Sequence, residues 1–474
     1  MRVAALSRTN SIGYIVVLKW FERDRAALIR DPIASMTPMF RSAVSFAFRR
    51  MLSLGIAGAV LVPQAQAGKP VAAPASAPYA LFGGKPLEWE RSGGKVVGVY
   101  TPNWQPAALV DALHGDSVTH ILYAFLHVCG PGQLPEDAPK CVGKADFQLA
   151  TSAIDDTFND AFARLKARAP HVKVVASVGG WGGSDPFFHI AAAAAPRVAF
   201  AKSAADFLRA HPAFDGIDID WEHPTNNGAA NGVQLGSPAD GQGYAELMAA
   251  LRSALDTLTA ENGHKYLVTS AINTDRALVG KVNYRDAAKS LDYIFMMTYD
   301  FYGSWTPGTG NHAALRASGP DAGDGLDAAV KTMTAAGVPA GKLVAGVAMY
   351  GRGFTGVDKP AAGKGFSGAP HTGSYPAPEG ASDWRELAGR TIDRNGRGLH
   401  GYQAIFDAQT QSWNLYNARN RLFMGYDDPR TVIAKGAFAR QAGLAGVFAW
   451  ELSQDNGDIL NAMNYGVGNA LLQP

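Results

Sequence analysis

The sequence predicts an α/β fold, a (β/α)8 TIM barrel that carries a small α+β insertion. Three observations indicate this fold class. From Lys95 onward, short runs rich in β-branched residues alternate with helical segments, which is typical of a parallel sheet built from βα units. There are eight such runs, the number that closes a barrel. A single long gap without a long helix, between Phe354 and about Asp427, interrupts the alternation.

The runs and the segments between them give the elements in chain order. The expected strands are Lys95–Tyr100, His120–Leu126, Val172–Val178, Phe214–Glu222, Tyr266–Ile272, Tyr293–Tyr299, Leu343–Met349 and Gly446–Glu451. The expected helices include Phe147–Ala169, Arg197–Ala210, Tyr244–Glu261, Gly325–Ala336, Arg430–Gln441 and Ile459–Leu471. An open doubly wound sheet is the alternative, but no glycine-rich dinucleotide fingerprint follows the first run. A barrel places its active site at the C-terminal ends of the strands.

The long gap predicts the insertion. A connection of this length is not expected to be structureless inside a compact domain, so residues 355–427 are predicted to form an α+β unit beside the strand ends. Most of its aromatic residues are interpreted as a small core of the insertion. Trp413 is kept as a candidate for ligand contact. The whole predicted catalytic domain spans residues 95–474.

The N-terminal part reads as a targeting segment. Arginines at 41, 49 and 50 precede an apolar run from Met51 to Val62, and Ala65-Gln66-Ala67 is a small-residue cleavage pattern. The apolar run is too short to anchor the protein in a membrane. Residues 1–67 are therefore predicted to be an extension and signal peptide, with translation starting at Met36 or Met39, and the product to be secreted to the periplasm or the medium. Residues 68–94 are rich in proline and alanine and are expected to be a flexible linker.

Charge and cysteine usage restrict the classes of partner. The net charge is +2, but residues 1–67 hold nine Lys and Arg against three Asp and Glu, so the remainder is mildly acidic. This argues against a nucleic-acid partner and suits a neutral substrate. The two cysteines, Cys129 and Cys141, are expected to close a small disulfide loop after export, worth about 3 kcal/mol. No metal site or cofactor is expected, and the protein is expected to be a monomer.

One stretch carries the clearest chemical signal, Phe214-Asp215-Gly216-Ile217-Asp218-Ile219-Asp220-Trp221-Glu222. As a strand it places Asp218, Asp220 and Glu222 on one face and the apolar residues on the other. Asp215 has the opposite parity and is interpreted as a structural hydrogen-bonding residue. A solvated acidic edge strand is the alternative, but the isoleucines and Trp221 favour burial. Crowded carboxylates separate in pKa, so one stays protonated near neutral pH as a general acid. Glu222, at the strand tip, is the predicted acid.

Asp215-x-x-Asp218-x-Asp220-x-Glu222 resembles the DxxDxDxE signature of family 18 glycoside hydrolases, the chitinases and their relatives. Other strand ends agree in the expected order. Ser177-Val178-Gly179-Gly180-Trp181 is similar to the SxGG motif of that family, and the segments Met297-Thr298-Tyr299-Asp300 and Met349-Tyr350-Gly351-Arg352 are similar to two further motifs. The resemblance covers residues 95–470, and it implies that the insertion between strands seven and eight walls a deep substrate groove.

The resemblance implies a role for each motif residue. Tyr299 would donate a hydrogen bond to the acetamido oxygen of the substrate, and Asp300 would hold a sugar hydroxyl. Trp450 would stack beneath the reacting sugar. Further candidates for substrate binding are Arg352, Trp181, Tyr123, Trp305 and Trp413. An ordinary packing role is the alternative for most of these, and in particular Tyr123 belongs to a motif whose aromatic residues more often fill the barrel.

The implied chemistry is retaining hydrolysis in which the 2-acetamido group of the substrate is the nucleophile. Glu222 would be acid and then base, Asp220 would stabilise the cationic intermediate, and Asp218 would share a proton with Asp220. The expected substrates are chitin and chitooligosaccharides. Two alternatives remain: an endo-β-N-acetylglucosaminidase acting on N-glycans, and a non-catalytic chitin-binding lectin. The presence of Glu222 argues against the lectin, because binding-only relatives typically lack this acid.

Overall fold

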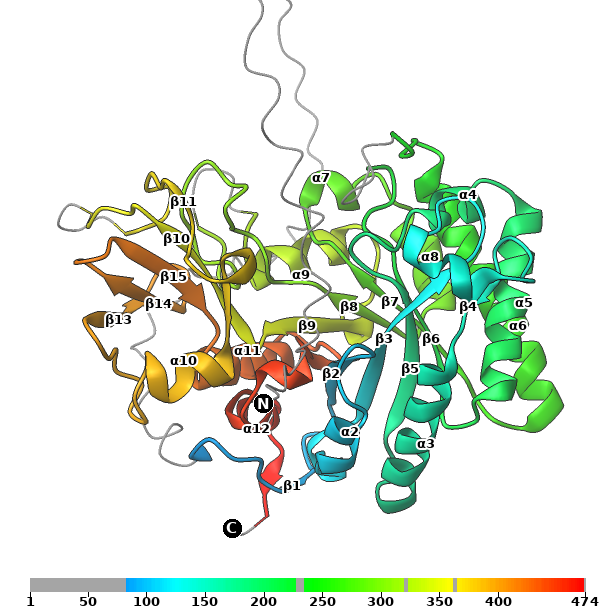
Figure 1. Ribbon diagram of the computed structural model, residues 1–474, viewed down its shortest axis with the longest axis horizontal. Coiled ribbons are helices and arrows are strands. Elements are labelled where there is room, and N and C mark those ends of the chain that lie inside the picture. The colour runs from blue at the N-terminus through cyan, green and yellow to red at the C-terminus, as the bar shows by residue number, and fades with distance from the viewer. Residues whose placement is uncertain (1–81, 227–233, 319–322, 361–364, 473–474) are drawn as a thin grey trace, which may run out of the picture. The chain divides into compact units, whose positions relative to one another are not determined.

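The computed structural model describes residues 82–226, 234–318, 323–360 and 365–472 (Figure 1). The predicted leader, its cleavage site and residues 68–81 lie outside these ranges. Within them, no helix is both long and apolar enough to cross a membrane.

Eight parallel strands close into a barrel, as predicted. They are β2 (Val96–Pro102), β3 (His120–Val128), β5 (Lys173–Gly179), β6 (Gly216–Asp220), β7 (Leu267–Ile272), β8 (Tyr293–Met296), β9 (Leu343–Ala348) and β16 (Gly446–Trp450). Each pairs with its neighbour in chain order, β16 pairs with both β9 and β2, and the β2–β3 ladder completes the ring. A short strand, β4 (Leu149–Ala150), adds to β3 in antiparallel orientation.

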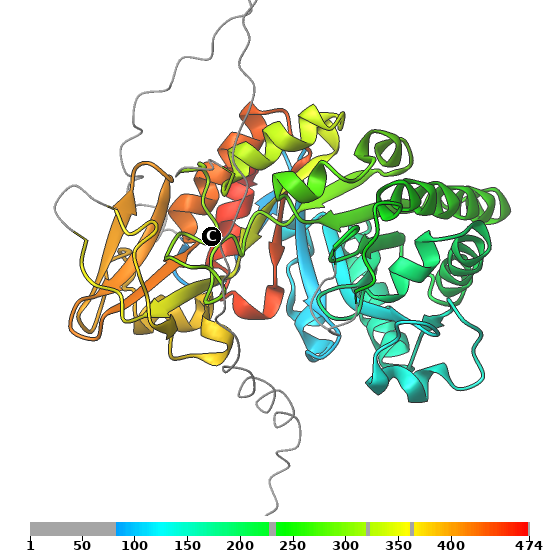
Figure 2. The ribbon, with the colours of Figure 1, turned by 90° about the horizontal axis from the view of Figure 1, so that it is seen from above.

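Helices cover the outside of the barrel (Figures 1 and 2). The predicted ones are present as α3 (Ala153–Arg168), α5 (Ala194–Ala210), α6 (Asp240–Asn262), α9 (Leu326–Ala335), α11 (Pro429–Gln441) and α12 (Asp458–Val467). Shorter helices are α2 (Ala108–Ala112), α4 (Pro186–Ala191), α7 (Arg276–Val279) and α8 (Tyr284–Ser290). Local sequence fixes their ends. A capping box of Ser152 and Asp155 begins α3, and Gly263, in the left-handed region at φ 75°, ends α6.

The alternation predicted for β6 is present. Ile217 and Ile219 are fully buried in the large apolar cluster shared with the surrounding helices. Asp218 points inward, where it meets side chains of other barrel strands. Asp215, at the opposite parity, accepts from Lys166 Nζ at 2.8 Å and from the Val174 amide at 2.8 Å. The interpretation of Asp215 as a structural residue is therefore confirmed.

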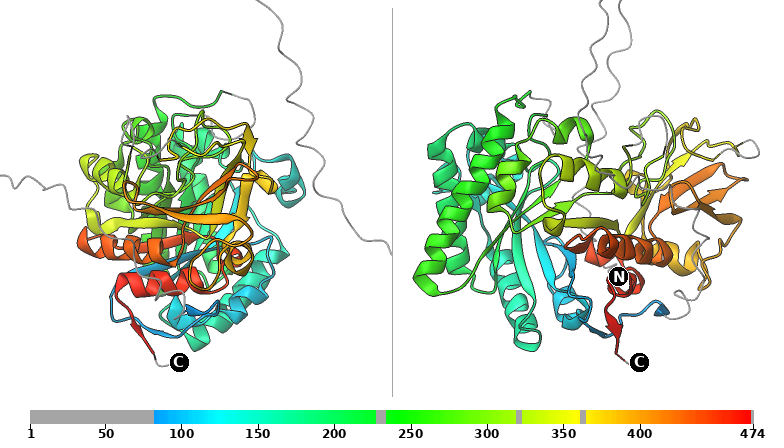
Figure 3. Two further views of the ribbon diagram at one scale, coloured as in Figure 1. Left: turned by 90° about the vertical axis from the view of Figure 1, so that its left-hand side faces the viewer. Right: turned by 180° about the vertical axis from the view of Figure 1, so that it is seen from behind.

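The insertion is a six-stranded antiparallel sheet on the opposite side of the barrel from α5 and α6 (Figure 3). Its strands are β10 (Tyr350–Thr355), β11 (Gly373–Ser374), β12 (Ala381–Asp383), β13 (Tyr402–Asp407), β14 (Ser412–Asn417) and β15 (Leu422–Tyr426), with helix α10 (Trp384–Arg390). Phe354, Phe366, Tyr416 and Phe423 form its core. The predicted start at residue 355 is late, because β10 begins at Tyr350 and only one residue separates it from the end of β9.

Two expectations about the periphery have different outcomes. The linker prediction is wrong for residues 82–94, because Phe82 and Trp89 are buried and β1 (Trp89–Glu90) pairs with β17 (Ala470–Leu471). The disulfide is confirmed: it joins Cys129, just after β3, to Cys141 at the end of the 3-10 helix η2 (Pro135–Cys141).

Candidate active site

The carboxylates of β6 lie at the C-terminal mouth of the barrel, and Asp218 is the deepest. It is fully buried. Parallel register places Ser177 of β5 and Thr269 of β7 beside it. Both hydroxyls donate to it, at 2.7 Å and 2.6 Å, and Tyr100 of β2 donates at 3.2 Å. Burial raises the pKa of Asp218 to about 6, and the three hydroxyl donors oppose that rise.

Asp220 has a contrasting environment. It is only 3% exposed, and its Oδ1 atom is buried with no hydrogen-bond partner among the described residues. Its pKa is raised well above the ordinary value, first by burial and then by the neighbouring charges of Glu222 and Asp218. Burial and these charges therefore disfavour the ionised form of Asp220, and its Oδ1 atom is available to a ligand.

Glu222 follows β6 directly and is held by its backbone. Its amide donates to Ser184 Oγ at 3.2 Å, in the loop that follows β5. The side chain is 14% exposed. Burial, followed by the charge of Asp300, raises the pKa of Glu222 to about 8. The carboxyl is therefore protonated at neutral pH and open to solvent at its tip, as a general acid requires.

Asp300 is a fixed anion on the opposite wall. Arg352 of β10 donates to both of its oxygens, at 2.5 Å and 2.8 Å, and Tyr350 Oη donates at 2.6 Å. Behind it lies the fully buried His312, whose Nδ1 is 3.4 Å from the Asp300 Oδ1 and whose Nε2 is 3.2 Å from the Tyr350 carbonyl oxygen. Burial alone would raise the pKa of Asp300, but contacts with His312 and Arg352 outweigh it and hold the pKa below its ordinary value.

Tyr299 lies between these two groups of charges. Its ring centroid is 6.4 Å from that of Tyr350 and 6.1 Å from that of Phe448. Burial raises its pKa well above the ordinary value, and the charges of Asp220 and Asp300 add to the effect. The phenol therefore keeps its proton and can act as a hydrogen-bond donor beside the β6 carboxylates.

Aromatic side chains line the mouth around these groups. Trp450 stacks on Phe125 with centroids 5.7 Å apart and lies 6.3 Å from Trp104. Trp181 is 68% exposed, and its ring is 6.4 Å from that of His223. Trp305 is 58% exposed, and the Arg352 guanidinium lies 5.0 Å from its ring. Trp450, Trp181, Trp305 and Arg352 thus come from four different segments and meet near the carboxylates.

Two sequence-based candidates for substrate binding are corrected by the structure. Tyr123 is fully buried and faces outward, where its hydroxyl donates to Asp155 of α3 at 2.6 Å and its ring packs against Phe158. Trp413 is 9% exposed and lies under the Arg430 guanidinium, 3.3 Å from its ring centroid. Both side chains are packing residues, because neither faces the mouth of the barrel.

Sequence reasoning gave no role to several residues that complete the site. Tyr100, Thr269 and His312 contact the key carboxylates from separate segments. No motif marks them, and only their inward parity or their place after a strand could have drawn attention to them. No group of three or more His, Cys, Asp or Glu within the described ranges is arranged to hold a metal ion.

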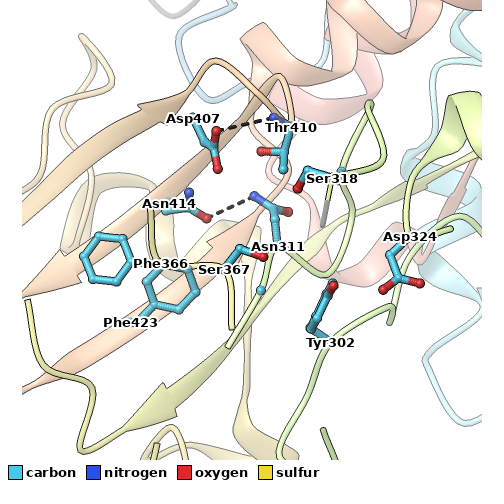
Figure 4. A pocket seen from close by; sticks show the side chains of 12 residues that line it. Tyr302, Asn311, Ser318, Asp324, Phe366, Ser367, Asp407, Thr410, Asn414 and Phe423 are labelled. Atoms are coloured by element: carbon cyan, nitrogen blue, oxygen red, sulfur yellow. Dashed lines mark hydrogen bonds between the residues drawn. The ribbon is translucent and has the colours of Figure 1, made fainter. Parts of the chain in front are cut away.

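A small hollow with polar and apolar lining lies apart from Asp218, Asp220 and Glu222, between the loop that follows β8 and the insertion sheet (Figure 4). Asn311 crosses one side of it and donates to Asn414 Oδ1 at 3.0 Å and to the Trp413 carbonyl at 3.2 Å. These contacts attach the loop that carries Asp300 and His312 to the insertion. The hollow is thus part of the support of the site.

Comparison with known proteins identifies relatives over most of the barrel. Residues 96–455 match the family described as glycosyl hydrolases family 18. The chain is 35% identical over 433 residues to Chitinase A of Pseudoalteromonas piscicida, an alignment that covers 79% of this chain but 52% of that protein. It is also 35% identical over 412 residues to a probable endochitinase of Orgyia pseudotsugata multicapsid polyhedrosis virus, covering 79% of this chain and 72% of the relative. The chain thus spans about half the length of the first relative.

Solved structures agree with the fold. Chitinase ChiA74 from Bacillus thuringiensis superposes with a TM-score of 0.68 at 26% identity, covering 80% of this chain and 71% of that one. The family 18 chitinase from Cycas revoluta, solved in complex with (GlcNAc)3, superposes with a TM-score of 0.63 at 26% identity, covering 79% of this chain and all of that one.

Proposed function

The chain belongs to glycosyl hydrolase family 18, and we propose that it hydrolyses the β-1,4 links of chitin and chitooligosaccharides with retention of configuration. The observation that carries the proposal is that Glu222 and Asp220, on the same face of the chain at β6, differ in their surroundings and hydrogen bonding. Glu222, with its pKa raised to about 8, is a proton donor, and Asp220 keeps one buried oxygen without a partner within the described ranges. The relative solved with (GlcNAc)3 supports the substrate class.

The reaction follows from these positions. Glu222 protonates the glycosidic oxygen, and the bond to the leaving sugar breaks as the acetamido oxygen of the substrate attacks the anomeric carbon. The resulting oxazolinium ion is positive, so it needs an anion nearby. Asp220 supplies it after passing its proton to Asp218, and its free oxygen accepts the acetamido N–H. Tyr299 donates to the acetamido oxygen. Water deprotonated by Glu222 then opens the ring, and the proton returns to the carboxyl.

The remaining candidates for substrate binding fit the same groove. Trp450 offers a ring at the barrel mouth, while Trp181 and Trp305 offer exposed rings on the loops after β5 and β8. Arg352 orders Asp300 through two hydrogen bonds, so its proposed role is to orient that carboxylate toward a sugar hydroxyl. Tyr123 and Trp413 have no part in this proposal.

Hydrolysis of a chitin hexamer tests the proposal, with product lengths and anomers separated within seconds of mixing. We expect new β-anomers at the cleaved ends, and Glu222→Gln is expected to lower kcat by at least about a thousandfold while largely sparing binding. An exposed glutamate, Glu136, provides the matched control Glu136→Gln. If folded wild-type protein binds the hexamer without cleaving it, the lectin alternative gains support. Release of N-glycans from a glycoprotein instead would favour the endo-β-N-acetylglucosaminidase alternative.

We further propose that the protein is exported as a monomer after cleavage near Ala67, with a catalytic domain that includes residues 82–94 as well as the predicted 95–474. The basic and apolar pattern of residues 41–67 supports export. The disulfide between Cys129 and Cys141 is consistent with an oxidising compartment. N-terminal sequencing of protein recovered from the culture medium and periplasm tests the cleavage site, and light scattering of the mature protein tests the monomer.

A further inference from the structure

His223 follows Glu222 directly and lies against it. The side chain is 11% exposed, and its Nε2 atom is 3.9 Å from the Glu222 Oε2. The mechanism above gives this residue no role. We propose that His223 is a positioning residue for Glu222 and directs an Nε2–H donor toward it. On the other side of the ring, the Nδ1 atom accepts a hydrogen bond from water in a hollow behind β6. The proposal rests on the proposed function of Glu222 as the acid.

The hollow lies on the helix side of β6 and β7 and has room for about one water molecule. Trp221 and His223 line it together with Asn273, Tyr244, Tyr284 and apolar residues. Trp221 Nε1 and His223 Nδ1 are both buried, and neither has a hydrogen-bond partner among the described residues. Buried polar atoms of this kind normally bind protein groups or ordered water, and a site with two or more polar partners and sufficient room holds water.

One water molecule can satisfy both nitrogens. The indole Nε1–H can only donate, so its partner must accept. A water molecule that accepts from Trp221 has its own hydrogens free to donate to His223 Nδ1. In the arrangement we propose, the water donates to Nδ1, so the neutral imidazole carries its proton on Nε2; a water that accepted from both nitrogens would instead leave the proton on Nδ1. The Nε2–H therefore points to the side of the ring on which Glu222 lies.

Burial keeps this imidazole neutral at working pH. Burial lowers the pKa of His223 to about 4, although Asp275 in the loop after β7 opposes the change. Asp220 and Asp300 are the other ionisable carboxyls that interact with Glu222, and the phenol of Tyr299 faces them all. No described cation acts on Glu222 directly, so a neutral donor at Nε2 is the group placed to stabilise its ionised form.

The donor is useful at one stage of the reaction. Once Glu222 has given its proton to the leaving sugar, it must persist as a carboxylate until water attacks. An N–H directed at Oε2 stabilises that carboxylate and fixes its orientation. The distance of 3.9 Å in the free protein is longer than a hydrogen bond, but catalytic hydrogen bonds are often long without substrate and shorten in the complex.

Three substitutions separate positioning from packing. His223→Gln places an amide N–H close to where Nε2 lies, His223→Asn places one close to Nδ1, and His223→Phe keeps only the ring. We expect His223→Phe and His223→Asn to move the basic limb of the kcat/KM profile upward by about one pH unit and to lower kcat about tenfold with little change in KM. His223→Gln is expected to keep the limb close to that of the wild type.

The proposal is overturned if the Phe and Asn variants keep the wild-type basic limb, or if the Gln variant behaves like them. Should His223→Phe fail to fold, the Asn and Gln variants still decide, because both are polar and of similar size. A measurement independent of turnover is NMR of the imidazole nitrogens of His223 in the wild type. A proton on Nδ1 would contradict the proposal, whereas absence of hexamer cleavage by the wild type would contradict only the proposed function.

Discussion

Replacing Glu222 by glutamine is expected to stabilise the folded protein increasingly as the pH rises. The pKa of this carboxyl is about 8 in the folded protein, against 4.5 for an ordinary glutamate. Between these two pH values the folded protein keeps a proton that the unfolded chain has released, so the free energy of unfolding falls as pH increases. At about 1.4 kcal/mol per pH unit, the interval amounts to at most about 5 kcal/mol. Glutamine cannot ionise and avoids this loss.

Asp220 adds to the expected stabilisation of the Glu222→Gln variant at high pH. The charge of Glu222 is the second cause of the raised pKa of Asp220, so its removal also relieves Asp220. The side chain of Glu222 is 14% exposed, and water reaching its tip makes the figure above an upper limit.

Urea unfolding of the two proteins from pH 4 to pH 9 measures this difference. The free energies of unfolding should coincide at pH 4, where the carboxyl is protonated in both states, and should diverge by several kcal/mol at pH 9. The exposed Glu136→Gln control should follow the wild type throughout. A difference between Glu222→Gln and wild type that is the same at pH 4 and pH 9 would refute the reasoning, because it would mean that Glu222 ionises normally in the folded protein.

Two further variants test the effect of Asp300 on Glu222 and the contribution of the disulfide to stability. Asp300→Asn removes a negative charge that raises the pKa of Glu222, so the basic limb of kcat/KM should move downward, on the order of one pH unit; an unmoved or higher limb would contradict the assigned cause. Replacing Cys129 and Cys141 by serine opens a loop with a sequence separation of 12 and should lower the free energy of unfolding by about 3 kcal/mol. With reductant present, wild type and the double variant should unfold alike, and a remaining gap would point to lost packing.

The barrel could be predicted because its strands are short, β-branched and separated by amphipathic helices. The predicted strand boundaries are wrong where the chain changes direction without a turn signal in the sequence. Tyr299 was expected to end the sixth barrel strand, yet β8 stops at Met296 and Asp300 adopts a left-handed backbone at φ 58°. The run from Leu343 to Thr355 is continuous in sequence, although it forms a barrel strand and then the first strand of the insertion.

The shared face of Asp218, Asp220 and Glu222 could be predicted from the alternation of side chains within one strand. The residues that hydrogen-bond to these carboxyls could not be predicted in this way. Ser177 and Thr269 stand beside Asp218 only because three parallel strands share one register, and a single sequence does not specify that register. The error for Tyr123 has the same origin. The family resemblance of its motif implied an inward position, but the outer face of β3 offers Asp155 as a partner, and that carboxylate is itself fixed by the N-terminus of α3.

The hydrogen bonds along the row determine which proton is available for the proposed reaction. Asp218 receives three hydroxyl donors and has its pKa at about 6, while Asp220 has an unpartnered oxygen and a pKa well above its ordinary value. The hydroxyl donors favour the ionised form of Asp218, whereas burial and the neighbouring charges disfavour the ionised form of Asp220, which is the form that stabilises a cation. Substrate binding must reverse this order. The hydroxyls of Ser177, Thr269 and Tyr100 can rotate from donating to accepting, so Asp218 can take up the proton without moving. The developing positive charge beside Asp220 then lowers its pKa, and the transfer becomes favourable at the moment when the anion is needed.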